Sequence, residues 1–279
     1  NNSSRGHGMP FKDLENFNLK DFVLKERDHE NLWLFMHIPK TAGSSFAEAM
    51  RKQVFPYRNI EVDYNDASAS FPDKIGQAAD AFIADLDHRI YKSASGHIYF
   101  DLVERIQRKA KKAKVVTLLR DPVSRVVSDY RYQRTVLHPL HLEFIEQFPA
   151  LESYIAFKGS QNTMATFISG HNQSLDSDAL ISRLDNEFSF VGAQEMYPLS
   201  YNIIFNLFGI PDQFPTSHAR KTPDIPATKV EITDDLMDAI RDANRLDVQI
   251  YNHIIDRLLS IKETWVSYVN TGFPDEWQN

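Results

Sequence analysis

Short apolar runs alternate with segments of helical periodicity along the first two thirds of the chain. The runs 31–37 and 114–119 are continuous and rich in aromatic or β-branched residues, which is typical of buried strands. Three further segments are strand candidates: 59–64, 89–95 and 188–192. Apolar residues three and four positions apart predict helices over 46–54, 75–87, 99–112 and 123–130.

The pattern beyond Pro139 is mostly helical. Helices are predicted there over 151–158, 161–168, 175–186, 195–208 and 233–268. This order predicts an α/β protein with a P-loop-like, three-layer fold, in which helices flank a central parallel sheet and the C-terminal half is helix-rich. Ligands of such folds bind at the carboxyl ends of the strands.

One domain is the expected organisation. The 279 residues are 42% hydrophobic, enough for one large core. The first ten residues are polar and small and lack the apolar stretch of a signal peptide, so we interpret 1–28 as a tail or artificial remnant and 29–279 as a single domain. The segment 209–226 carries four prolines and is interpreted as a long functional loop inside that domain.

Composition excludes several classes of function. The absence of cysteine rules out disulfides, cysteine-ligated metals and a thiol nucleophile. The formal net charge of −7 argues against nucleic-acid binding. No window of 18 apolar residues predicts a transmembrane segment in this chain. A cytoplasmic location is favoured slightly, the alternative being a Golgi lumen protein whose membrane anchor has been removed, and the oligomeric state is left open.

The segment 39–45, here named the phosphate loop, joins the first strand to the first helix. Backbone N–H groups and the helix dipole at such a junction favour an anion. Lys40 adds a positive charge, and the hydroxyls of Thr41, Ser44 and Ser45 are hydrogen-bond donors. The ATPase pattern G-x-x-x-x-G-K-[ST] is not satisfied, because Lys40 precedes Gly43. A loop that only packs a helix on a sheet is the alternative.

A second anion-binding segment is predicted where the strand 114–119 ends. Arg120 follows that strand and Ser128 lies two turns into the next helix. Arginine can bind a phosphate through two parallel hydrogen bonds, although pairing of Arg120 with Asp121 is the alternative. Two such segments suggest a ligand with phosphates at two separated positions, as in 3′,5′-bisphosphorylated adenosine. No acidic pair beside the loop indicates a metal, since Asp121 precedes a proline and is interpreted as fixing the turn.

Two long motifs resemble those of a known enzyme family. Residues 35–46 (FMHIPKTAGSSF) look like the 5′-phosphosulfate loop of the carbohydrate sulfotransferases that include the heparan sulfate 2-O- and 6-O-sulfotransferases. Residues 119–130 (LRDPVSRVVSDY) are similar to the 3′-phosphate segment of that family, and Gly96-His97 lies between the two as expected. Weaker similarity continues through 190–192 with Glu195 and through Asp247 with Tyr251.

The resemblance implies a sulfotransferase that uses 3′-phosphoadenosine-5′-phosphosulfate (PAPS), releases PAP and needs no metal. It implies in-line transfer of the sulfuryl group to a hydroxyl, expected to belong to a carbohydrate. His97 would be the general base and Lys40 would stabilise charge on the leaving oxygen. The nucleotide-binding residues carried over from the family motifs are Lys40, Thr41, Ala42, Gly43, Ser44, Ser45, Arg120 and Ser128.

Some expectations are specific to this chain. Its acidity and lack of cysteine favour a glycan other than heparan. Tyr132, Arg134 and Asn162 are candidate acceptor contacts, and Arg220 and Lys221 are candidates to close over the nucleotide. Two alternative functions stay open at this point, a nucleotide-dependent kinase or NTPase that uses the same loop, and a catalytically inactive nucleotide- or glycan-binding protein.

Overall fold

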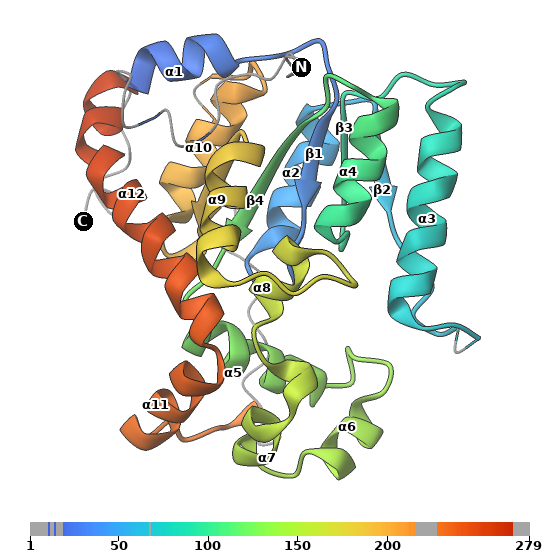
Figure 1. Ribbon diagram of the computed structural model, residues 1–279, viewed down its shortest axis with the longest axis vertical. Coiled ribbons are helices and arrows are strands. Elements are labelled where there is room, and N and C mark those ends of the chain that lie inside the picture. The colour runs from blue at the N-terminus through green and yellow to red at the C-terminus, as the bar shows by residue number, and fades with distance from the viewer. Residues whose placement is uncertain are drawn as a thin grey trace.

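Five parallel strands form the centre of the computed structural model (Figure 1). The structure describes residues 11, 14, 19–66, 68–211, 213–215 and 228–269. The strands are β1 (Trp33–Met36), β2 (Tyr57–Ile60), β3 (Ser93–Gly96), β4 (Lys114–Leu119) and β5 (Phe190–Ala193). Their spatial order is β2-β3-β1-β4-β5, so the chain starts the sheet in the middle and builds outward on both sides.

The central strand β1 is buried along its whole length, as parallel strands covered on both faces are. Its neighbours are β3 and β4, with Trp33 opposite both Ser93 and Lys114. The last residue of β3 must be glycine, because a Cβ at Gly96 would lie 2.3 Å from the carbonyl oxygen of Ile60. Close packing of β2 on β3 therefore depends on this residue.

Helices cover both faces of the sheet. They are α1 (Leu19–Glu26), α2 (Gly43–Gln53), α3 (Phe71–Asp85), α4 (Phe100–Lys109), α5 (Pro122–Gln133), α6 (His141–Gln147), α7 (Leu151–Ala156), η2 (Lys158–Ser160), α8 (Thr163–Ser169), α9 (Ser177–Glu187), η3 (Gln194–Met196), α10 (Tyr197–Leu207), α11 (Asp234–Ala243) and α12 (Arg245–Val269). α4 and α9 lie in front of the sheet, and α2 and α10 lie behind it (Figure 1). On the rear face the ring of Phe46 from α2 is 5.6 Å from that of Phe205 from α10.

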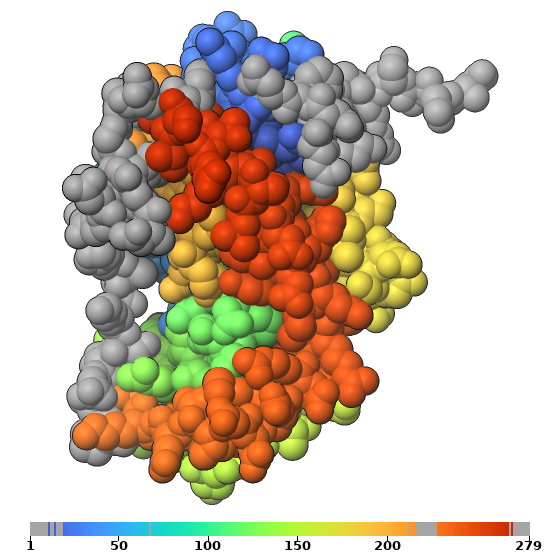
Figure 2. All heavy atoms as spheres, turned by 90° about the vertical axis from the view of Figure 1, so that its left-hand side faces the viewer, coloured from blue at the N-terminus to red at the C-terminus, as the bar shows by residue number. Residues whose placement is uncertain are grey.

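A second hydrophobic cluster lies beyond the carboxyl ends of the strands, built by α5, α6, α7 and α11 (Figure 1). Tyr130 and Tyr154 form its aromatic centre, with ring centroids 5.7 Å apart. The side view in Figure 2 shows α11 and α12 following one another along the surface, with α5 reaching the surface beside them. The cluster thus places a helical layer across the strand ends.

The predicted three-layer α/β fold is confirmed, although some boundaries differ. Strand β2 ends at Ile60 rather than at residue 64, because its pairing with β3 stops at Gly96. Strand β3 begins at Ser93, whereas the sequence pattern predicted a strand that begins at residue 89. None of the described helices is long and apolar enough to cross a membrane.

The N-terminal segment 19–26 differs from the expected tail. It forms α1, in which Leu19, Phe22 and Val23 are buried against α10 and α12. Spacings of three and four residues put these side chains on one helix face. Residues 19–26 are therefore not part of a tail, in contrast to the expectation for 1–28. Residues 1–10 lie outside the described part of the chain.

Candidate active site

Four strand ends bring the polar residues of the site together. His97 follows β3, the phosphate loop follows β1, Arg120 follows β4 and Glu195 follows β5. Because these strands are neighbours in the order β3-β1-β4-β5 and all run parallel, the four segments emerge side by side at one edge of the sheet. They border a cavity of about 2630 Å³ between the sheet and the helical layer below it.

The phosphate loop turns sharply before α2 begins. Lys40 and Ala42 both have φ of 69°, in the left-handed region that is uncommon for residues other than glycine. The N-cap residue of α2 is Ala42, whose side chain forms no capping hydrogen bond, so the N–H groups of the first turn lack the usual acceptor from the N-cap position. Gly43, Ser44 and Ser45 line the cavity. An uncapped helix N-terminus that faces a cavity is suited to an anion.

Gly43 packs directly on a buried imidazole. A Cβ at this position would lie 1.9 Å from Cδ2 of His37. The His37 ring stacks on Phe35 with centroids 5.6 Å apart, and its centroid is 4.2 Å from that of His97. Burial lowers the pKa of His37 well below its ordinary value, and the nearby charges of His97 and Lys40 add to this effect. His37 is therefore a neutral support beneath the loop.

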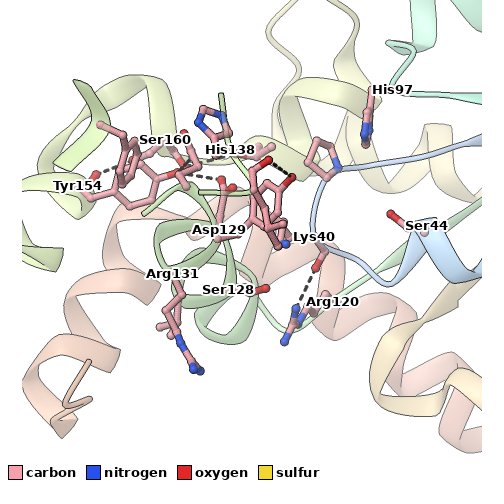
Figure 3. A pocket seen from close by; sticks show the side chains of 18 of the residues that line it. Lys40, Ser44, His97, Arg120, Ser128, Asp129, Arg131, His138, Tyr154 and Ser160 are labelled. Atoms are coloured by element: carbon pink, nitrogen blue, oxygen red, sulfur yellow. Dashed lines mark hydrogen bonds between the residues drawn. The ribbon is translucent and has the colours of Figure 1, made fainter. Parts of the chain in front are cut away.

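Arg120 connects the two anion-binding segments. Its Nη1 donates a hydrogen bond of 3.0 Å to the carbonyl oxygen of Lys40, shown dashed in Figure 3. Its buried Nε has no hydrogen-bond partner among the described residues. Burial lowers the pKa of Arg120, and the carboxylate of Glu195 opposes this effect. Ser128 of α5 lines the same cavity, and Figure 3 shows it beside Arg120.

His97 is held in one tautomer. Its Nδ1 lies 2.7 Å from the carbonyl oxygen of His37. A carbonyl oxygen can only accept, so Nδ1 carries the hydrogen and the neutral ring has its lone pair on Nε2. Burial lowers the pKa of His97, whereas the bond to His37 and the carboxylate of Asp129 oppose this effect. His97 is therefore suited to accept a proton at Nε2.

The ammonium group of Lys40 lies inside the cavity, 4.0 Å from the ring centroid of Tyr132. Burial lowers its pKa; the carboxylate of Asp129 opposes this effect, and Arg120 and Arg125 add to it. The aromatic face of Tyr132 stabilises this half-buried ammonium group through a cation–π contact. Lys40 thus lies between the anion-binding segments and the rest of the cavity.

Some predicted site residues lie elsewhere or are committed to other contacts. The hydroxyl of Thr41 is buried and donates to the carbonyl oxygen of Ile38 at 2.9 Å, so it is not free to bind phosphate as expected. Tyr132 lines the cavity, whereas Arg134 does not and donates to the carbonyl oxygen of Phe148 at 3.0 Å.

Asn162 is also outside the cavity lining. Its Oδ1 accepts from the backbone N–H of Leu246 at 3.0 Å and caps the start of α12. Both side chains form hydrogen bonds to the backbone without lining this cavity, and acceptor contacts at Arg134 and Asn162 stay a prediction. Arg220 and Lys221 lie outside the described residues.

The cavity also contains residues that the motifs did not single out. They include Ser124, Asp129, Arg131, His138 and Tyr154. Ser124 and Asp129 both lie inside the motif 119–130, so their place in it was an available signal. The others come from helices and loops of the second cluster, whose position over the sheet only the tertiary structure shows. No three His, Cys, Asp or Glu side chains of the described residues gather as a metal site.

A loop at the first strand that suits an anion, an arginine at the neighbouring strand and an imidazole in the same cavity are features of a group-transfer site for a phosphorylated ligand. The model of the sulfotransferase family matches residues 22–253, and the chain belongs to that family. It is therefore an enzyme of sulfuryl transfer, as the sequence predicted.

Solved sulfotransferases are distantly similar to this chain. A sulfotransferase from Alicyclobacillus acidocaldarius is 16% identical with a TM-score of 0.45, and the match covers 80% of this chain and 95% of the other. A mouse sulfotransferase complexed with PAP is 14% identical with a TM-score of 0.40, covering 91% of this chain and 90% of the other. A comparison with curated proteins finds no match.

Proposed function

We propose that the enzyme transfers the sulfuryl group of PAPS to a hydroxyl of a carbohydrate, with His97 as general base. The observation that supports this most directly is the hydrogen bond of 3.0 Å from Arg120 to the carbonyl oxygen of Lys40. It joins two anion-binding segments that suit phosphates at the two ends of one nucleotide. The imidazole of His97 lines the same cavity.

The residues present fit a doubly phosphorylated nucleotide. The uncapped first turn of α2, with Ser44 and Ser45, would hold the 5′-phosphosulfate. Arg120, whose buried Nε has no partner among the described residues, would bind the 3′-phosphate together with Ser128. PAPS supplies an activated sulfuryl group on a good leaving group, so fixed positive charge and positioning provide much of the catalysis.

The transfer itself is an in-line displacement. The acceptor oxygen forms a bond to sulfur while the bond between sulfur and the bridging phosphate oxygen breaks. His97 takes the acceptor proton at Nε2, the atom left free by its bond to His37. Lys40 balances the negative charge that develops on the phosphate oxygen, and PAP leaves with that electron pair.

The walls of the cavity support a carbohydrate as acceptor. Its volume of about 2630 Å³ is larger than the roughly 300–1,000 Å³ of ordinary small-molecule sites, which leaves room beside a nucleotide. Tyr99 and Phe167 line it as a stacked pair with centroids 4.5 Å apart, and Tyr64 and Phe71 form a second pair at 6.1 Å. Flat aromatic faces beside polar groups suit the C–H faces and hydroxyls of a sugar ring.

Ligand-dependent stability tests the choice of nucleotide. PAP should raise the melting temperature of the protein more than ATP with Mg²⁺ at the same concentration, because a ligand stabilises the state that binds it. Arg120→Ala should abolish most of the PAP effect. Stabilisation by Mg-ATP alone would contradict the proposal and favour a kinase or NTPase.

Replacement of the base tests the catalytic assignment. His97→Ala should lower kcat by about 100-fold or more while leaving PAP binding in place. Since burial lowers the pKa of His97, the acid limb of kcat/KM for the unmodified enzyme should lie below pH 6.5. The base is then active above that limb and lost as the pH falls through it. His88→Ala, on an exposed turn after α3, is the matched control. Full activity of His97→Ala would remove this residue from the mechanism.

A further inference from the structure

The cavity continues on the side of Lys40 that faces away from the phosphate segments. Figure 3 shows Ser44 and Arg120 on one side of Lys40, and Asp129, His138 and Tyr154 on the other. Asp129 lines the same cavity as Lys40, His97 and His138. Continuation of the cavity past Lys40 defines an acceptor side, which contains Asp129.

The carboxylate of Asp129 is held in place through one of its oxygens. Oδ2 accepts a hydrogen bond of 2.8 Å from the hydroxyl of Tyr154 and lies 3.5 Å from Nη1 of Arg125. Oδ1 receives no hydrogen bond from any residue in the described part of the chain, and Asp129 lines the cavity. The side chain is therefore oriented by its neighbours and has an acceptor atom left for a ligand.

A carboxylate at this position weakens binding of the nucleotide, so nucleotide binding by itself does not explain its presence. A sulfuryl donor is a polyanion, and like charges brought close together repel. Arg125, which is fully buried, offsets part of the charge of Asp129. A carboxylate retained beside the reacting groups suits hydrogen-bond donors, which a carbohydrate supplies in its hydroxyl and amino groups.

We propose that Asp129 anchors the acceptor by accepting a hydrogen bond from a hydroxyl or amino group adjacent to the reacting hydroxyl, and thereby selects neutral or cationic sugars over anionic ones. This inference rests on the proposed sulfotransferase reaction. In that reaction Asp129 binds and orients the acceptor, whereas His97 removes the proton.

The other charged groups of the cavity support the same selection. Arg131 also lines the cavity, and Figure 3 shows it on the same side of Lys40 as Asp129, so it counts as a positive charge there. The remaining acidic side chains of the lining are Asp63, Glu143 and Glu231, and the remaining lysine is Lys229. The lining away from the phosphate segments therefore carries more negative than positive charge among the described residues. A uronic acid or sulfated polymer would meet these carboxylates.

The test compares acceptors of one length and three charges. Chitotetraose, its de-N-acetylated form and a tetragalacturonate serve as the neutral, cationic and anionic sugars, with PAPS and the full chain. The unmodified enzyme should prefer the first two. Asp129→Asn should raise KM for them about 10-fold or more, the effect of losing a hydrogen bond to a charged group, with a smaller change in kcat. The variant should also discriminate less strongly than the unmodified enzyme between tetragalacturonate and the other two sugars.

Two control variants separate anchoring from a structural role. Glu146→Gln removes a charge from α6 at a position outside the cavity lining and should leave all three KM values unchanged. Tyr154→Phe keeps the carboxylate but removes the 2.8 Å bond, so it should raise KM less than Asp129→Asn and keep the charge preference.

The outcomes distinguish this inference from the function on which it rests. If PAP fails to stabilise the protein, the proposed function fails. If PAP binds but Asp129→Asn leaves KM and the charge preference unchanged, the anchoring role is wrong. Absence of turnover with both the neutral and the cationic sugar, while PAP still binds, would overturn the assigned acceptor class.

Discussion

At the scale of single residues, the site depends on a stack of small and planar groups under the phosphate loop. Gly43 lies on His37, and the His37 carbonyl oxygen orients His97. The phosphate loop, His37 and His97 are thus one packed unit, in which a change at Gly43 is expected to reach His97. Tight packing makes such a unit sensitive to a single added carbon.

A pair of glycine substitutions measures this sensitivity. Gly43→Ala places a Cβ against the fixed His37 ring, so we expect roughly 1–3 kcal/mol of destabilisation and a clear loss of PAP affinity. Gly76→Ala, inside α3 with no atom within 4 Å of the added carbon, should instead stabilise the protein by about 0.5–1 kcal/mol. Urea unfolding and PAP titration measure both variants. Equal behaviour of the two would contradict the packing argument.

At the scale of elements, a buried carboxylate joins α12 to the start of α8. Asp247 accepts from the backbone N–H groups of Met164 at 3.2 Å and Ala165 at 2.8 Å. Burial raises its pKa to about 6, although the charge of Arg125 and the two N–H groups oppose this effect. Nη1 of the same Arg125 lies 3.5 Å from Oδ2 of Asp129.

The pH dependence of stability tests the raised pKa of Asp247. The ordinary value is 3.8, so the folded state holds a proton that the unfolded state has released between about pH 4 and 6. The stabilisation from that proton is fully present at low pH and is lost as the pH rises through 6. The unfolding free energy of the unmodified protein relative to Asp247→Asn should therefore fall by about 1–3 kcal/mol from pH 4 to 7.

A control for this experiment is Asp235→Asn in the first turn of α11, which removes an exposed carboxylate. It should show no comparable slope. Urea denaturation at several pH values gives the free energies. If the difference in unfolding free energy between the unmodified protein and Asp247→Asn does not change with pH, the carboxyl group of Asp247 has the same pKa in the folded and unfolded states.

At the scale of the whole molecule, the outward growth of the sheet from β1 puts three chemistry-bearing segments on adjacent strands. The N-terminal helix α1 and the long C-terminal helix α12 pack together beside α10, so both parts of the chain contribute to one main core. The second cluster closes the cavity from below. The N-terminal segment 19–26 is therefore part of the folded unit.

Substitutions in α1 test this. Phe22→Ala removes a fully buried ring and should cost about 3–5 kcal/mol of unfolding free energy. Leu24→Ala, two residues along the same helix and 50% exposed, should change stability by no more than about 0.5 kcal/mol. Urea unfolding measures both. A small effect of Phe22→Ala would show that α1 adds little to the core and would restore the interpretation of a tail.

The amino-acid sequence alone determined the strand–loop–helix unit at 31–54, the α/β class and the roles expected of Lys40, Arg120 and His97. These features follow from local periodicity and contiguous motifs. Only the tertiary structure showed the strand order. It also showed that the side chains of Thr41, Arg134 and Asn162 form hydrogen bonds to the backbone.

The acceptor side of the cavity is the clearest case of this division. Asp129 and Tyr154 are 25 residues apart and belong to different helices, so no local pattern joins them. Their contact depends on how the helical layer docks over the strand ends, which is decided by burial of many distant side chains at once. The sequence therefore predicted which groups would bind the nucleotide and transfer the sulfuryl group, whereas the tertiary structure alone brought together the groups that we propose to meet the acceptor.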